Sequence, residues 1–177
     1  MYEKTISSQE VYHGKLLNFR IDKVLLPDNR ESSREIVEHP GAVAIVPLKN
    51  EDIYLVKQFR KPVEESLLEI PAGTLEPGEA PLQCARRELA EETGYEAGKI
   101  EKITTFYTSP GICTETMHLY LALDLVETEG QTDSDEFIEL EKYNYKQVDS
   151  LIIEGRIKDA KTIIGILLAQ KVVKNIK

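Results

Sequence analysis

Residues 73–95 read GTLEPGEAPLQCARRELAEETGY, and no other stretch of the chain says as much about the structure. The segment 81–93 predicts a helix, and at about 100° per residue Glu88, Glu91 and Glu92 fall on one side of it. Clustered carboxylates repel one another, at a cost of roughly a few tenths of a kcal/mol per pair. Divalent cations would turn that cost into a binding site, and hard oxygen ligands favour Mg²⁺ or Mn²⁺. A solvated acidic face is the alternative. The flanking glycines, the arginine and the apolar positions also fall in register, which favours the metal site.

The length, composition and net charge of the chain limit the classes of protein to which it can belong. A length of 177 residues predicts one domain, or one domain with an appendage, and 41% hydrophobic with 30% charged residues allows a buried core. The net charge of −9 argues against a nucleic-acid partner, because a phosphate backbone requires a basic face. An anionic substrate must therefore be held by local arginines and by metals.

The two cysteines and the chain start predict a location. Cys84 and Cys113 form neither a metal motif nor a disulfide framework, which favours a reducing cytoplasm. The start, MYEKTISSQE, lacks the apolar segment of a signal peptide. No apolar stretch approaches the ~20 residues that span a membrane, so no membrane partner is expected.

Hydrophobic periodicity and turn residues place the other elements. Expected strands lie at 15–26 (one strand or a pair), 34–38, 41–48, 53–59, 100–107, 116–126 and 137–145. Expected helices lie at 81–93, 146–154 and 159–174, with a loop at 127–136. Asp159 is the expected N-cap of the last helix. The expected buried stripe of that helix is Ile163, Ile164, Leu167, Leu168 and Val172. Strands that enclose a central helix, with a further helix at the end, predict an α/β sandwich.

The stretch 73–95 resembles the Nudix box. That pattern is G, five residues, E, seven residues, R-E, an apolar residue, any residue, E-E, any residue, G and an apolar residue. The matching positions are Gly73, Glu79, Arg87, Glu88, Leu89, Glu91, Glu92, Gly94 and Tyr95. The resemblance implies a hydrolase of a nucleoside diphosphate linked to another moiety. It also implies an α/β/α sandwich with a mixed sheet.

The resemblance also suggests a division of the chain. Residues 41–177 would form the Nudix hydrolase domain. Residues 1–40 precede the family's core, and in similar proteins such an extension forms a small sheet that contributes to a dimer. We therefore expect a small N-terminal β extension and a homodimer.

Pyrophosphate hydrolysis requires charge neutralised on the phosphoryl oxygens, a positioned water and a proton acceptor. By resemblance, Glu88 and Glu92 are the principal metal ligands, with the backbone carbonyl of Ala72 as a third. Glu91 shares a second ion or orients a bound water. The expected cofactor is Mg²⁺, with Mn²⁺ as a substitute.

Four positions of the box have expected structural roles. In the family's pattern, Arg87 and Glu79 tie the loop to the helix. Gly73 permits the turn that aims the Ala72 carbonyl at the metal. Gly94 closes the helix as a C-cap.

The general base lies outside the box. Related ADP-ribose hydrolases carry it in a loop between the last strands, where the candidates are Asp133, Asp135 and Glu136. We choose Glu136, as catalytic acid or as metal ligand. Several similar proteins have glutamate at the position of Ser134, and a solvated acidic loop is the alternative.

The substrate class follows from the segment FYTSPG at 106–111. Pro110 lies fifteen residues beyond Tyr95, and this offset, followed by Glu115, resembles the ADP-ribose pyrophosphatase subgroup. Pro110 and Gly111 form a turn with an adaptable backbone. Glu115 is expected to accept hydrogen bonds from a ribose.

Further positions extend the resemblance along the chain. Arg34 resembles an arginine that approaches the substrate, with a surface role as the alternative. Arg60 is placed to pair with a diphosphate. Phe19 is assigned to stack on adenine, with a core role as the alternative, and Thr74 is assigned to the substrate as well. Glu69 is either an acid that supports the site or a charge on a strand face.

Together these features predict a cytoplasmic, Mg²⁺-dependent Nudix hydrolase that splits ADP-ribose into AMP and ribose 5-phosphate. One rival is the same chemistry on GDP-mannose or an ADP-sugar. A rival of another class is a protein that senses ADP-ribose without cleaving it. Such a sensor would be expected to have lost box carboxylates, and this chain retains all of them.

Overall fold

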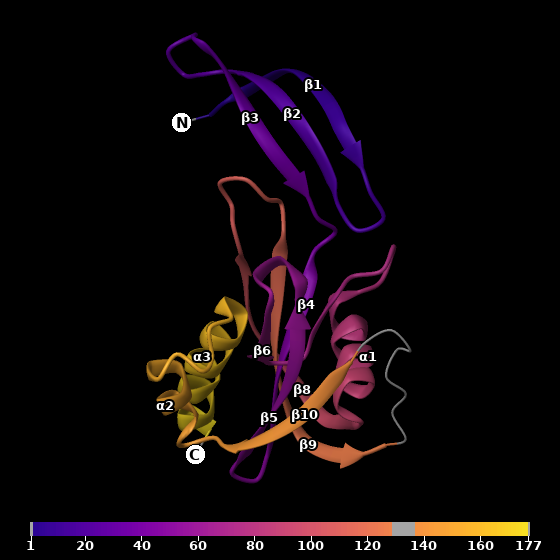
Figure 1. Cartoon of the computed structure of the whole chain (residues 1–177), viewed down its shortest axis with the longest axis vertical. Coiled ribbons are helices and arrows are strands. Elements are labelled where there is room, and N and C mark those ends of the chain that lie inside the picture. The colour runs from indigo at the N-terminus through magenta and orange to yellow at the C-terminus, as the bar shows by residue number, and fades with distance from the viewer. Residues whose placement is uncertain (1, 129–136, 177) are drawn as a thin grey trace. The chain divides into compact units, whose positions relative to one another are not determined.

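The computed structural model describes residues 2–128 and 137–176 (Figure 1). The chain divides into two compact units, one of residues 1–41 and 106–117 and the other of residues 42–105 and 118–177. No helix in the described part of the chain is long and apolar enough to cross a membrane.

The larger unit is a sheet between helices. Its central path has the strand order β10 (Ile138–Asn144), β5 (Asp52–Arg60), β4 (Ala42–Lys49), β9 (Thr116–Glu127) and β8 (Tyr95–Tyr107). The short strands β6 (Glu65–Glu69) and β7 (Ala72–Thr74) pair with β5 and β4, after the 3₁₀ turn η1 (Lys61–Val63). Helix α1 (Pro81–Thr93) covers one face, and α2 (Val148–Ile153) with α3 (Ala160–Ile176) covers the other (Figure 1). This arrangement confirms the predicted α/β/α sandwich.

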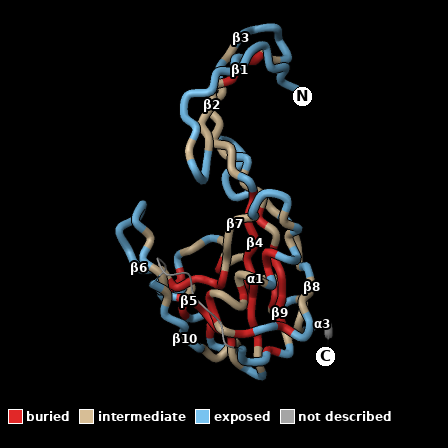
Figure 2. Tube along the Cα trace, turned by 90° about the vertical axis from the view of Figure 1, so that its right-hand side faces the viewer, coloured by how far each residue is buried: buried red, intermediate tan, exposed pale blue. Residues whose placement is uncertain are grey.

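Buried residues are concentrated on the central strands of the larger unit (Figure 2). In β4 every residue from Ala42 to Leu48 is buried, as the nearly continuous apolar run predicts. The expected strands at 41–48 and 53–59 pair as a hairpin: Leu48 pairs with Ile53 across a turn in which Asn50 has φ 60°. The strand that follows places Arg60 at its end, and β7 places Ala72 beside β4.

Helix α1 ends as its sequence predicts. Gly94 adopts φ 69° and donates its N–H to the carbonyl of Ala90 at 2.9 Å, so the left-handed C-cap forms. The chain then enters β8 directly at Tyr95, earlier than the expected start near residue 100. That start was missed because Tyr95 and Ala97 are buried while Glu96 and Gly98 are exposed, so only a short alternation marks it.

The expected stripe on α3 is wrong in its phase. Among the described side chains of α3, the buried residues are Thr162, Gly165, Ile166 and Ala169. Of the expected stripe, Leu167 is 44% exposed, and Ile163, Ile164, Leu168 and Val172 are half-buried. Every residue from Ile163 to Ala169 is apolar or glycine, so periodicity alone does not select a face there. Small residues allow the helix to approach the sheet closely, and tertiary packing therefore selects them rather than the largest side chains.

The smaller unit contains an antiparallel sheet in the order β1 (Lys4–His13), β2 (Asn18–Leu25) and β3 (Glu31–Glu38). Residues 106–117 attach to β3: Val37 donates to the carbonyl of Ile112 at 2.8 Å and accepts from the N–H of Thr114 at 2.9 Å. Every residue of β1 is exposed. The sequence did not predict this strand, because a strand without a buried face leaves no period-two pattern.

Candidate active site

A bidentate ion pair joins the loop before α1 to the helix. The Nε and Nη2 atoms of Arg87 each donate to a carboxylate oxygen of Glu79 at 3.0 Å. These bonds lower the pKa of Glu79 to about 2 and raise the pKa of Arg87. The same arginine reaches the buried Sγ of Cys84 at 3.4 Å, and burial, with the nearby Glu79, raises the pKa of that thiol to about 12. This is the structural role that the resemblance implies for Glu79 and Arg87.

Arg87 also gathers two of the box carboxylates. Its Nη1 donates to Glu88 at 2.7 Å and to Glu91 at 2.9 Å. The Glu88 carboxylate lies directly against Gly73, where a Cβ atom would be 1.9 Å from its carboxyl carbon. The expected reason for Gly73, an unusual backbone turn, is therefore wrong. Gly73 does not have a positive φ, and what the position requires is room for Glu88.

Glu92 joins the helix to strand β7. It is 7% exposed, and its Oε2 accepts the backbone N–H of Ala72 at 3.0 Å. The N–H and C=O of one residue in an extended strand face the same edge. Since the N–H of Ala72 faces Glu92, its carbonyl faces the side of α1 as well.

The donors at this position suit a hard divalent cation. Glu88 and Glu92 both reach β7, Glu91 shares Arg87 with Glu88, and the Ala72 carbonyl is turned toward the same side. Oxygen ligands of this kind fit Mg²⁺ or Mn²⁺. Within residues 2–128 and 137–176, no three acidic, histidine or cysteine side chains already form a ligating group. Arg87 and the Ala72 N–H hold the carboxylates instead.

The orientation of the Arg60 side chain is fixed by a buried acid. Its Nε and Nη2 each donate to Glu69 at 2.8 Å, and its side chain remains 38% exposed. The hydrogen bond to Glu69 raises the pKa of Arg60, and the charge of Glu92 contributes to the same shift. Arg60 therefore lies within the electrostatic field of Glu92.

Glu69 is a buried anion and not a charge on a strand face. It is 1% exposed, and Lys161 of α3 donates to it beside Arg60. Burial alone would raise its pKa, but the hydrogen bonds and charges of Arg60 and Lys161 lower it. Arg60 and Lys161 thus both bind the buried carboxylate of Glu69.

Sequence reasoning missed the part of α3 that joins this cluster. Lys161 also contacts Asp159 at 3.1 Å. Asp159 caps the helix as predicted, accepting the Thr162 N–H at 2.9 Å, and the Thr162 hydroxyl in turn accepts the N–H of Ile70 at 2.8 Å. The Asp-x-x-Thr spacing was the available signal, but it indicates only a cap. The contact to Ile70 depends on packing.

Five of the predicted substrate residues lie in the smaller unit. Arg34 is held by Glu3 through two hydrogen bonds of 2.6 and 2.9 Å. A hollow of about 340 Å³ brings Arg34 together with Pro110 and Gly111, and Arg20 and Thr114 also line it.

The other two residues of that group lie elsewhere in the smaller unit. Phe19 is half-buried on β2 opposite Val37. Glu115 accepts the hydroxyl of Thr108 at 2.6 Å and lies 3.9 Å from His39.

Two further predicted residues are accounted for separately. Thr74 lies in the larger unit, at the end of β7 and opposite Ala42. Glu136, like the rival bases Asp133 and Asp135, lies outside the described residues, so the choice of loop acid stays a prediction.

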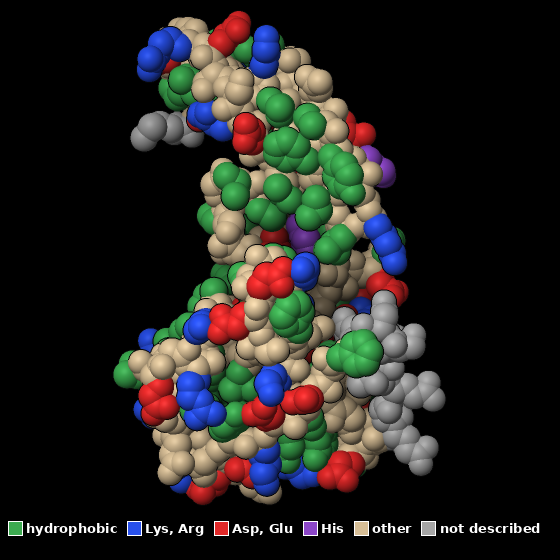
Figure 3. Space-filling model, in the orientation of Figure 1, with side chains coloured by type: hydrophobic (Ala, Val, Ile, Leu, Met, Phe, Trp, Pro, Cys, Tyr) green, Lys and Arg blue, Asp and Glu red, His purple; other side chains and the backbone are tan. Residues whose placement is uncertain are grey.

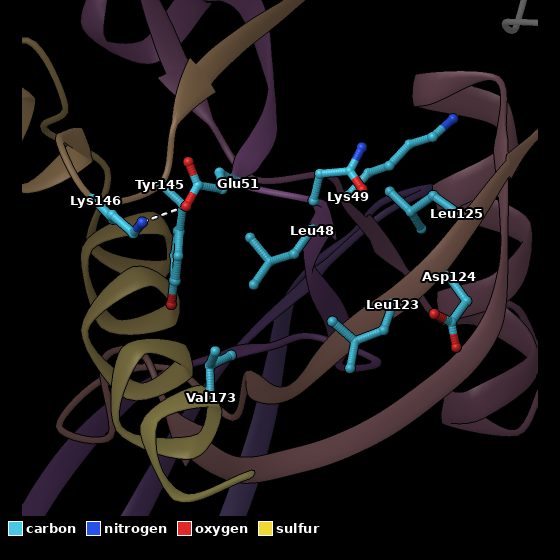
Figure 4. Close-up of a pocket in the computed structure, with 10 residues that line it drawn as sticks. Leu48, Lys49, Glu51, Leu123, Asp124, Leu125, Tyr145, Lys146 and Val173 are labelled. Carbon is cyan, nitrogen blue, oxygen red and sulfur yellow. Dashed lines mark hydrogen bonds and ion pairs between the residues drawn. The ribbon is translucent and has the colours of Figure 1, made fainter. Parts of the chain in front are cut away.

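The larger unit has a hollow of its own, of about 440 Å³, and none of the predicted site residues line it (Figure 4). Leu48, Leu123 and Val173 line it, and Lys146 closes an ion pair with Glu51 at its rim. Lys49 extends away to the ring of Tyr95, 4.9 Å from its centroid. The apolar walls of this hollow and the paired charges at its rim do not suit a diphosphate.

Comparison with known proteins gives the class. The model of the NUDIX domain matches residues 38–164, so the chain belongs to the Nudix family, whose hydrolases generally use divalent metal ions. An ADP-ribose pyrophosphatase of Bacillus subtilis (strain 168) is 46% identical over 171 residues, covering 95% of this chain and 92% of that protein. A methanol dehydrogenase activator of Bacillus methanolicus is 45% identical over 171 residues, with the same coverage of 95% and 92%.

One solved structure shows the same fold. The crystal structure of an ADP compounds hydrolase superposes with a TM-score of 0.89, covering 99% of this chain and 96% of that one. Its identity is 19%, so this likeness concerns the fold alone.

Proposed function

We propose that this protein hydrolyses the diphosphate of ADP-ribose to AMP and ribose 5-phosphate, with Mg²⁺ as its metal and Mn²⁺ as a substitute. The observation that carries the proposal is the folded box itself. Glu88 lies against Gly73 and Glu92 binds the N–H of Ala72, so the acids of α1 and the carbonyl of β7 share one side. The identity of 46% to an ADP-ribose pyrophosphatase supports this substrate.

The proposed metal ligands and the arginine that binds the diphosphate belong to the larger unit. Glu88 and Glu92 are the principal metal ligands with the Ala72 carbonyl, and Glu91 completes the set. A divalent cation held by these residues would neutralise charge on the diphosphate oxygens and would lower the pKa of a bound water. Arg60, fixed in orientation by Glu69, contributes a positive charge toward the diphosphate.

Proton transfer and substrate recognition belong to the remaining predicted residues. Glu136 takes the proton of the attacking water. Arg34, Pro110 and Gly111 contact the substrate, which agrees with their common hollow in the smaller unit. Phe19, Thr74 and Glu115 complete the predicted substrate contacts.

We also propose a cytoplasmic homodimer formed through the smaller unit. Apolar side chains gather on the face of that unit shown in Figure 3. The exposed ones in the unit are Tyr2, Ile6, Val11, Tyr12, Leu16, Leu17, Tyr107 and Ile112. An exposed apolar group of this size on a small sheet is typical of a surface that pairs with another copy.

Product analysis with purified protein tests the reaction. ADP-ribose is incubated with Mg²⁺ beside GDP-mannose, ADP-glucose and diadenosine compounds at equal concentrations. AMP and ribose 5-phosphate forming fastest from ADP-ribose is the expected result. Faster turnover of another compound would retain the chemistry and refute the substrate. Tight ADP-ribose binding without turnover of any compound would favour the sensor.

Glu92→Gln tests the site. The amide keeps the shape of the side chain but removes its charge, so turnover is expected to fall by orders of magnitude while the fold survives. Glu96→Gln is the matched control, since Glu96 is exposed on β8, and it should turn over substrate normally. Rates like those of the unmodified protein from Glu92→Gln would refute the assignment.

A further inference from the structure

We propose that Thr162 of α3 is a positioning residue that sets the orientation of the Ala72 carbonyl and thereby the affinity for the divalent cation. This inference rests on the proposed function, which assigns that carbonyl to the metal. It concerns residues outside the Nudix box that contact neither metal nor substrate.

The first step is the contact between α3 and the segment that precedes β7. The Thr162 hydroxyl accepts the backbone N–H of Ile70 at 2.8 Å, and both residues are 0% exposed. The hydroxyl has one proton, which it donates to Asp159 at 2.6 Å. Because Asp159 takes the proton, the lone pairs of the hydroxyl are left to face Ile70.

A second contact joins the same helix to the same residue. A Cβ atom on Gly165 would lie 2.8 Å from the Cδ1 atom of Ile70, so the helix backbone lies directly against this side chain. Thr162 and Gly165 are three positions apart and therefore share a face of α3. The helix thus holds Ile70 by its backbone and by its side chain.

The segment from Ile70 to Ala72 is consequently held at each residue in turn. Thr162 binds the N–H of Ile70, the N–H of Ile45 in β4 binds the carbonyl of Pro71 at 2.9 Å, and Glu92 of α1 binds the N–H of Ala72. These contacts come from three different elements. Together they restrain the chain up to the N–H of Ala72, and the pairing of Gly73 with Val43 of β4 continues the restraint past the Ala72 carbonyl.

Lys161 keeps the start of α3 in place. It binds the buried Glu69, the residue immediately before Ile70, and it also contacts Asp159 at 3.1 Å. The ion pair and the Thr162 hydrogen bond therefore connect neighbouring residues of each segment. Lys161 contacts a side chain, whereas Thr162 contacts the backbone N–H of Ile70. Thr162 is therefore the residue that influences the path of the backbone toward Ala72.

A titration of the metal-free protein with Mn²⁺ tests the inference without relying on activity. The electron paramagnetic resonance signal measures the free Mn²⁺ at each step. Thr162→Val removes the acceptor and keeps the shape. Its dissociation constant for Mn²⁺ is expected to rise about tenfold or more, as for other residues that orient ligands. Thr162→Ser retains the hydroxyl and should restore tight binding. Ile166→Val shortens a buried side chain of the same helix and should leave the constant unchanged.

Kinetics provide a second readout. The metal concentration for half-maximal rate should rise in Thr162→Val, while KM for ADP-ribose at saturating metal stays unchanged. Should Thr162→Val fail to fold, Thr162→Cys replaces it, because a thiol is a weaker acceptor in a similar volume. An intermediate dissociation constant is then expected.

The outcomes separate the two proposals. Unchanged Mn²⁺ affinity in Thr162→Val, or in Thr162→Cys where that replaces it, overturns the inference and leaves the proposed function standing. Equal weakening by Ile166→Val also overturns it, because the effect would then be general loosening of α3. No Mn²⁺ binding by the unmodified protein overturns the metal site itself, and the inference with it.

Discussion

Gly73 shows how a single position of the box is determined by its neighbour. Its backbone is unexceptional, but the Glu88 carboxylate occupies the place of a side chain. Arg87 holds that carboxylate from the other side at 2.7 Å. An added methyl group must therefore displace a proposed metal ligand that is already restrained.

Gly73→Ala is accordingly expected to lower turnover strongly while costing only about 1–3 kcal/mol of stability. Urea unfolding and turnover under saturating Mg²⁺ measure the two effects. Gly98→Ala serves as the control, because its Cβ would crowd Asp124 at 3.1 Å and not the box. Equal loss of turnover in both variants would contradict this account of Gly73.

Glu79 gives a pH dependence at the same scale. Its pKa in the folded protein, about 2, lies below the value of about 4.3 expected in the unfolded chain. A lowered folded pKa means that its contribution is complete above about pH 4.3 and is lost as the pH falls toward 2. Glu79→Gln should thus cost about 2 kcal/mol near pH 7 and progressively less below pH 4. Denaturant unfolding of both proteins from pH 7 to 2.5 measures this difference, and a pH-independent difference would contradict it.

Helix α3 is the element whose orientation sequence reasoning assigned incorrectly. Its buried face is made of Thr162, Gly165, Ile166 and Ala169, so close approach and one polar contact determine the rotation of the helix. Large apolar residues such as Leu167 remain partly exposed. The rotation matters for function because it aims Thr162 at Ile70.

A pair of glutamine substitutions tests this rotation. Ala169→Gln places a polar side chain where no space exists and should destabilise the fold by about 2–4 kcal/mol. Leu167→Gln changes a residue that is 44% exposed and should cost well under about 1 kcal/mol. Urea midpoints compare the two, and the reverse order would restore the orientation expected from periodicity.

At the scale of the whole molecule, the chain consists of two compact units with very different burial. The larger has a core around β4, whereas β1 of the smaller is exposed along its entire length. A small sheet with one weakly buried face is marginal alone in water. A second copy that covers this face is the role proposed for the exposed apolar group.

The double substitution Ile6→Lys with Leu16→Lys is expected to convert the proposed dimer to a monomer, because each lysine would place charge in the apolar contact. Light scattering coupled to gel filtration measures the mass. Ile153→Lys is the matched control, since Ile153 is 87% exposed in the larger unit and should leave the dimer intact. A dimer that survives the double substitution would refute this interface.

The sequence alone determined what depends on local pattern. The spacing of acids, arginine and glycines from Gly73 to Tyr95 predicts both the helix α1 and its chemistry, because i, i+3 and i+4 neighbours meet on any helix. The apolar run of β4 predicts a central strand, and Gly94 predicts the end of α1. These features need no distant partner.

Tertiary structure decided what depends on residues far apart in the chain. Glu88 meets Gly73, Arg60 is bound by Glu69, and Thr162 reaches Ile70 across 92 positions. A strand such as β1, with no buried face, likewise leaves no periodic signal. The three contacts share one physical reason: the partner of a side chain across the fold is set by packing, and local spacing in the sequence does not record that partner.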